Sequence, residues 1–189
     1  MELYLVRHPR PSRCEGLCYG RTDAAVDPEV LAAAAAEVRS LIPAGVLSRA
    51  ALFTSPASRC LGLARELAAP YEPCIAEELQ EMHFGAWEGL PWQSVPRDEL
   101  DAWAADVWSY RAGGGESTAM VAARWRGWCS RVAAQIGGRG RPVVAVTHGG
   151  LIRVALAGGR DAGAKLLIDA PFASVHRLDI DAVRAQSAC

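Results

Sequence analysis

Two hydrophobic patterns alternate along this chain of 189 residues. Short, nearly continuous apolar runs are typical of strands that are buried on both faces of a sheet. Such runs occupy 3–7, 50–54, 72–76 and 142–147, and an edge strand is predicted at 174–180. Helical spacing of apolar residues predicts helices at 29–42, 57–69, 118–136, 151–157 and 161–168. This alternation predicts an α/β fold with a mostly parallel sheet, and we expect a single domain over 1–189.

One segment carries most of the tryptophan. Four of the six tryptophans lie between residues 87 and 108. Within 91–110, the large apolar residues follow the spacing of one helical face: Trp92, Leu100, Trp103, Val107 and Trp108. We therefore expect a Trp-rich helical flap, inserted at about 80–117, with a small apolar cluster of its own. This cluster can be a core alone or can contact substrate, and exposed tryptophan would also suit a homodimer surface.

Composition narrows the classes of partner. Hydrophobic residues make up 51% and charged residues 22%, as in ordinary globular proteins, and the net charge is −1. No run rich in Lys or Arg occurs, so nucleic acid is not expected as a partner. No apolar run reaches the roughly 18 residues that cross a bilayer, and no signal peptide is evident. We therefore expect no membrane partner and a cytoplasmic location.

The six cysteines show no C-x-x-C pair. The pair Cys14 and Cys18, four positions apart, has no His or Cys neighbours at metal-ligand spacing. We expect free thiols in a reducing compartment, no bound metal and no cofactor.

A histidine directly follows two of the predicted strands. The first ends in Arg7 and is followed by His8, and the fourth is followed by His148, Gly149 and Gly150. Ligands bind at the carboxyl ends of strands in open α/β sheets. Glycines let backbone N–H groups approach a ligand, and a helix N-terminus favours an anion, so the second histidine segment suits an oxyanion. Alternatively, His8 only caps its strand and Arg7 is a surface charge.

Further arginines follow these strands. Residues 9–23 form a long loop rich in Pro and Gly, and Arg10, Arg13 and Arg21 favour an anion-facing role for it. Arg59 falls in the first turn of the helix after the second strand, where a positive side chain opposes the helix dipole. A nearby anion would explain that position, although a solvated surface position explains it equally well.

A candidate general acid lies before the flap. Glu81 is embedded among Leu79, Met82, Phe84 and Trp87. A carboxyl group in apolar surroundings loses hydration, which favours its protonated form and makes it usable as an acid near neutral pH. The other glutamates of this stretch can simply be solvated.

Together these residues resemble the histidine phosphatase superfamily, also called the phosphoglycerate mutase-like superfamily. Five motifs match in order over about residues 3–180. They are Arg7-His8, Thr54-Ser55-Pro56-x-x-Arg59, Leu79-x-Glu81-x-x-Phe84-Gly85-x-Trp87-Glu88-Gly89, Gly115-Glu116-Ser117 and Val146-Thr147-His148-Gly149-Gly150-x-Ile152-Arg153. The resemblance implies a three-layer α/β/α sandwich with a mostly parallel central sheet.

Within the superfamily, the chain resembles α-ribazole phosphatases, which act late in cobalamin assembly. The likeness lies in 7–9, 18–23 and 84–89. Two positions depart from the wider pattern: Pro9 stands where the signature has Gly, and Cys14 where many members place an Asn that touches the phosphate. We expect these departures to change the loop around the substrate rather than the core chemistry. The residues of this loop that would meet the substrate are Cys14, Tyr19 and Arg21.

The resemblance implies a phosphomonoesterase that needs no metal and acts on a small-molecule substrate, with α-ribazole 5′-phosphate as the expected one. His8 would attack phosphorus to give a phosphohistidine, which water then hydrolyses. Glu81 would act first as an acid and then as a base. The phosphoryl oxygens would be surrounded by Arg7, Arg59, His148 and the N–H of Gly149.

Three other functions share parts of this pattern. A broad-specificity sugar or nucleotide phosphatase would have the same motifs and differ only in the loop and the flap. A phosphoglycerate mutase would share the fold, but the short chain and Trp87-Glu88-Gly89 favour a phosphatase. An inactive phosphate-binding module is the third, although every residue that turnover requires is present.

Overall fold

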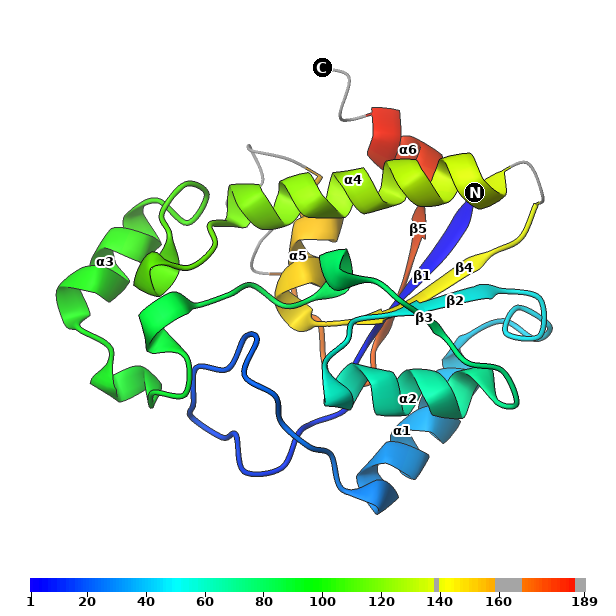
Figure 1. The fold of residues 1–189 in the computed structure, drawn as a ribbon, viewed down its shortest axis with the longest axis horizontal. Helices are drawn as coiled ribbons and strands as arrows, with labels where there is room; N and C mark the ends of the chain where they lie inside the picture. The colour runs from blue at the N-terminus through cyan, green and yellow to red at the C-terminus, as the bar shows by residue number, and fades with distance from the viewer. Residues whose placement is uncertain (138–139, 159–167, 186–189) are drawn as a thin grey trace.

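The computed structural model describes residues 1–137, 140–158 and 168–185 (Figure 1). Within these ranges the sheet has five strands in the order β3-β2-β4-β1-β5. Neighbours in the first four positions run parallel, and β5 pairs antiparallel with β1 at one edge. The predicted mostly parallel sheet is confirmed, although the weak strand predicted at 72–76 shortens to two residues. The strands are β1 Glu2–Arg7, β2 Ala51–Thr54, β3 Cys74–Ile75, β4 Val143–Thr147 and β5 Val175–Asp179.

Helices cover both faces of the sheet (Figure 1). On one face lie α1 Pro28–Leu41 and α2 Ser58–Ala68, and on the other α4 Thr118–Ile136, α5 Gly149–Ala157 and the short α6 Ile180–Ala185. Alternate side chains of the central strands supply the two cores. Leu3 and Leu5 pack on the α4 and α5 side, whereas Tyr4 and Val6 pack on the α1 and α2 side. The predicted three-layer sandwich is therefore confirmed.

The flap is less helical than the sequence predicts. A helix was expected over 91–110, but α3 covers only Arg97–Ala105. Pro96 has no N–H and stands just before the helix, and Asp106 leaves helical geometry with φ −139° and ψ 70°. The expected apolar cluster does form, from Trp87, Trp92, Trp103 and their neighbours. Trp108, by contrast, packs against the core on the α4 and α5 side of the sheet and lies outside that cluster.

Three further predictions concern a helix near the C-terminus, membrane crossing and the state of the cysteines. The helix predicted at 161–168 lies almost wholly outside the described residues. Among the helices that the structure describes, none combines the length and the apolar character that a membrane crossing requires. The five cysteines within the described ranges are free thiols, namely Cys14, Cys18, Cys60, Cys74 and Cys129.

Candidate active site

The two histidines meet because their strands are neighbours in register. Arg7 on β1 is paired with Thr147 on β4, so His8 and His148 are the next residues at the carboxyl ends of these strands. Their ring centroids lie 5.1 Å apart at an interplanar angle of 65°. The residues are only 2% and 1% exposed, respectively. Two nearly buried imidazoles thus face each other at the edge where open α/β sheets bind ligands.

His8 is fixed in one tautomer. Its Nδ1 lies 2.6 Å from the carbonyl oxygen of Pro9. A carbonyl oxygen can only accept, so Nδ1 carries the proton and Nε2 keeps its lone pair. Burial and the charges of Arg59 and Arg7 lower the pKa of His8 to about 3, although the bond to Pro9 acts in the opposite direction. A neutral imidazole with a free Nε2 is the form in which histidine is a nucleophile.

Arg59 reaches this region from the first turn of α2. Its guanidinium donates to the carbonyl oxygens of Gly20 (2.6 Å) and Thr22 (3.0 Å). Arg59 is 1% exposed, and its Nε has no hydrogen-bond partner. None of the ion pairs among the described residues includes Arg59 or Arg7. A buried cation without a carboxylate partner is costly unless an anion joins it.

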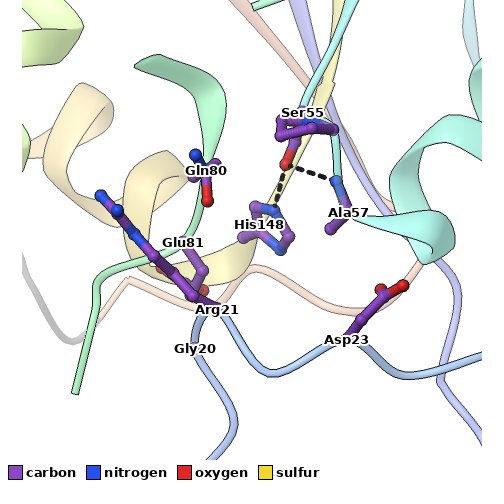
Figure 2. Close-up of a pocket in the computed structure, with 9 residues that line it drawn as sticks. Gly20, Arg21, Asp23, Ser55, Ala57, Gln80, Glu81 and His148 are labelled. Atoms are coloured by element: carbon purple, nitrogen blue, oxygen red, sulfur yellow. Dashed lines mark hydrogen bonds between the residues drawn. The ribbon is translucent and has the colours of Figure 1, made fainter. Parts of the chain in front are cut away.

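His148 lies between Arg59 and Ser55. Its Nδ1 is 3.3 Å from a guanidinium nitrogen of Arg59, which can only donate. The proton of His148 therefore lies on Nε2, which donates to the hydroxyl of Ser55 at 2.8 Å (Figure 2). Burial, followed by the charges of His8 and Arg59, lowers the pKa of His148 well below its usual value. Both imidazoles are therefore neutral at neutral pH.

Arg7 is the last residue of β1 and directly precedes His8. Its Nε has no partner, and its guanidinium donates to the carbonyl oxygen of Ala170. Burial lowers the pKa of Arg7, while the nearby charge of Glu81 raises it. A Cβ on Gly149 would lie 3.1 Å from Nε of Arg7, so the absence of a side chain there leaves room for the arginine. The first N–H of α5, that of Gly149, has no acceptor four residues earlier within the helix.

Glu81 is positioned by backbone groups. Its two carboxylate oxygens accept from the N–H of Met82 at 2.9 Å and of Gly150 at 3.0 Å. The side chain is half-buried and forms part of a cavity of about 240 Å³ beside His148 (Figure 2). The cavity is lined by Gly20, Arg21, Asp23, Ser55, Pro56, Ala57, Gln80, Glu81 and His148.

Comparison with known proteins identifies the family. Residues 3–187 match the model of the histidine phosphatase superfamily (branch 1). The chain belongs to the histidine phosphatase superfamily. A search of curated proteins found no match.

Solved structures agree with this assignment. Mycobacterial glucosyl-3-phosphoglycerate phosphatase in complex with VO3 is 27% identical with a TM-score of 0.79, and the alignment covers 94% of this chain and 92% of that one. The same enzyme with inorganic phosphate gives 28% identity, a TM-score of 0.78 and coverage of 94% and 89%. Phosphoglycerate mutase from Thermus thermophilus is 30% identical with a TM-score of 0.67 and coverage of 95% and 93%. This histidine phosphatase is accordingly a phosphoric monoester hydrolase.

The loop that borders the phosphatase site is held by Glu88, a residue of the matching motif to which the sequence assigned no role of its own. Glu88 accepts hydrogen bonds of 3.0 Å from the backbone N–H groups of Gly20, Arg21 and Thr22. Burial would raise the pKa of Glu88, but hydrogen bonds from Thr22 and its neighbours outweigh it and keep the pKa below its usual value. Since Arg59 binds carbonyl oxygens of the same loop, the loop is fixed through both its donors and its acceptors.

The three substrate-loop residues lie in different places. Arg21 lines the cavity beside His148 and forms an ion pair of 3.3 Å with Glu116. The ring of Tyr19 lies 5.4 Å from Cζ of Arg59. Cys14 lies instead in a separate cavity of about 500 Å³, which Tyr19 also lines. The structure therefore does not bring Cys14 into the cavity of His148 and Glu81.

Phe172 is a residue of this phosphatase that sequence reasoning missed. Its ring lies 5.6 Å from that of His8 and 3.9 Å from Cζ of Arg7, close enough for a cation–π contact. The antiparallel pairing of β5 with β1 places the turn before β5 beside His8. An aromatic residue just before the predicted edge strand was the available signal, but its use required knowledge of which strand β5 joins.

Proposed function

We propose that this phosphatase hydrolyses small-molecule phosphomonoesters without a metal, through a phosphohistidine on His8, and that its substrate is α-ribazole 5′-phosphate. One observation carries the catalytic part. His8 is neutral, its Nε2 is free, and the buried Arg59 and the half-buried Arg7 beside it each have an unpaired, buried Nε–H group. A nucleophile next to two cations with unpaired, buried N–H groups suits an anionic electrophile such as a phosphoryl group.

The phosphoryl group of the substrate would lie among positively charged side chains and a backbone N–H donor. Arg7 and Arg59 would donate through their unpaired Nε–H groups, and Gly149 at the N-terminus of α5 would add a backbone N–H. These donors neutralise the charge that a metal neutralises in other phosphoryl-transfer sites. His148 holds Arg59 in place and donates to Ser55, whose hydroxyl lines the cavity.

The reaction would take two steps. In the first, Nε2 of His8 forms a bond to phosphorus while the bond from phosphorus to the leaving oxygen breaks, and Glu81 gives its proton to that oxygen. In the second, water attacks phosphorus as the N–P bond breaks, and Glu81 takes the proton of the water. Inorganic phosphate and the original enzyme result.

Two observations bear on the substrate. The motifs 7–9, 18–23 and 84–89 resemble those of α-ribazole phosphatases, and α-ribazole is a nucleoside with an aromatic benzimidazole base. The similarity to glucosyl-3-phosphoglycerate phosphatase makes a sugar-glycerate phosphate the second candidate. Both candidate substrates are phosphomonoesters.

The test is a phosphate-release assay with excess EDTA over a panel of phosphomonoesters. The panel contains α-ribazole 5′-phosphate, glucosyl-3-phosphoglycerate, 3-phosphoglycerate, ribose 5-phosphate and AMP. We expect EDTA-resistant turnover, highest kcat/KM for α-ribazole 5′-phosphate, and an acid-labile phosphoenzyme after rapid quenching. The variant His8→Ala should lose both turnover and phosphoenzyme. Activity retained by His8→Ala would exclude the nucleophile, and a higher kcat/KM for another ester would exclude the proposed substrate.

A further inference from the structure

A second cavity borders the reaction centre on the side of the flap. Its volume is about 510 Å³, which is within the range of small-molecule sites. Glu81 and Gly150 line this cavity, and Glu81 also lines the cavity beside His148. The flap contributes Phe84, Trp103 and Val107 to the remaining wall. A group that extends from phosphorus past the carboxylate of Glu81 would therefore enter this space.

The aromatic wall of the cavity is rigid. The indole of Trp103 stacks on that of Trp92, with ring centroids 6.1 Å apart and an interplanar angle of 4°. Phe84 meets Trp103 edge to face, at 6.1 Å and 85°. Trp87 supports Trp103 from a third direction, with centroids 5.7 Å apart. Such mutual packing holds an aromatic surface in place before a ligand arrives.

Most of the residues that line this cavity are apolar. The hydroxyl of Thr118 already donates to the carbonyl oxygen of Val107 at 2.7 Å. Nε of Arg153 donates to the carbonyl oxygen of Ile168 at 3.1 Å. Burying a hydroxyl group without a hydrogen-bond partner is unfavourable, so a polyhydroxylated group would lose hydration against this mostly apolar lining.

We propose that this cavity binds the leaving group, and that the preferred leaving group is an alcohol that carries an aromatic ring seated against Trp103 and Phe84. The proposal rests on the phosphatase function proposed above, because it uses the position of Glu81 at the leaving oxygen. It assigns substrate selectivity to the flap, and it disfavours the unsubstituted glycerol and glycerate phosphates.

The test compares alkyl esters whose leaving groups are all primary alcohols. These are 2-phenylethyl phosphate, sn-glycerol 3-phosphate and 3-phosphoglycerate. Burial of one phenyl group is worth about 10- to 100-fold in kcat/KM, so we expect 2-phenylethyl phosphate to exceed the other two by at least about 10-fold. The variant Ala104→Trp places a large ring at the rim of the cavity, because Ala104 is exposed and lines it. Its matched control is Ala105→Trp, on the next position of α3, which is exposed and outside the cavity lining.

The outcomes separate the two proposals. Ala104→Trp should reduce the preference for the phenyl ester at least about five-fold, and Ala105→Trp should retain it. The inference is overturned if the wild type shows no preference for the phenyl ester, or if both variants keep that preference. Thermal melts of the two variants control for a fold defect. If the wild-type enzyme hydrolyses none of the esters, the phosphatase function itself fails, which is a different result.

Discussion

The carboxylate of Glu81 accepts a hydrogen bond of 3.0 Å from the N–H of Gly150, two residues beyond His148. A Cβ at position 150 would lie 2.3 Å from Oε1 of Glu81. The second glycine after the histidine thus provides both a donor for the acid and the space that the acid occupies. This relationship ties the start of α5 to the position of the proton donor.

The variant Gly150→Ala should therefore displace Glu81 with little effect on the fold, because the flexible end of a glutamate side chain can move away. We expect kcat to fall by at least about 10-fold on alkyl phosphates, since general acid catalysis contributes roughly 100- to 10,000-fold. The control is Gly127→Ala in α4, where a Cβ would meet no atom within 4 Å. Steady-state kinetics with thermal melts makes the comparison, and equal activity in the two variants would contradict the spatial argument.

The role of Glu81 itself is tested by how the activity lost in a Glu81 variant depends on the leaving group of the substrate. Glu81→Gln keeps the shape of the side chain but has no proton to give. Turnover of 2-phenylethyl phosphate should fall by roughly 100-fold or more, whereas p-nitrophenyl phosphate, whose leaving group needs no proton, should lose less than about 10-fold. Similar losses on both esters would mean that Glu81 does not act as the acid.

The depressed pKa of His8 predicts how stability depends on pH. The pKa is about 3 in the folded protein and about 6.5 in an unfolded chain, so the unfolded state binds more protons between these values. Stability must then fall as the pH falls from 7, and His8 alone should account for about 2 kcal/mol between pH 7 and pH 5. Urea unfolding at both pH values, in wild type and His8→Gln, measures this. The variant should show a smaller loss, and an identical loss would place the pKa of folded His8 near its ordinary value.

The sequence supplied most of the site because strand ends are local features. Apolar runs ending at Arg7 and before His148 were visible directly, and adjacent parallel strands then place those ends together. Phe172 depends on the pairing of β5 with β1, which no local pattern encodes. The helix predicted over 91–110 is too long because the tryptophan spacing in this range fits one helical face throughout. In the structure, α3 begins only after Pro96 and ends before Asp106, whose backbone is not helical.

Glu88 offers the last test, because its carboxylate holds the loop that also binds Arg59. The two carboxylate oxygens of Glu88 accept from the backbone N–H groups of Gly20, Arg21 and Thr22. In Glu88→Gln one of these oxygens becomes an NH2 group, which would face a backbone N–H and cannot accept from it. Loss of hydrogen bonds to a charged group predicts a destabilisation of about 1.5 to 3 kcal/mol.

The loop between His8 and Asp23 contains Arg13 and Arg21, each of which is a site for trypsin, whereas Arg10 is followed by a proline and is not cleaved. Release of this loop in Glu88→Gln should increase its cleavage rate and raise KM, since Arg59 would lose the carbonyl oxygens that orient it. Glu37→Gln, at an exposed position of α1, is the matched control. Mass spectrometry of the first tryptic cuts identifies the loop, and cleavage at the wild-type rate would show that Glu88 does not hold it.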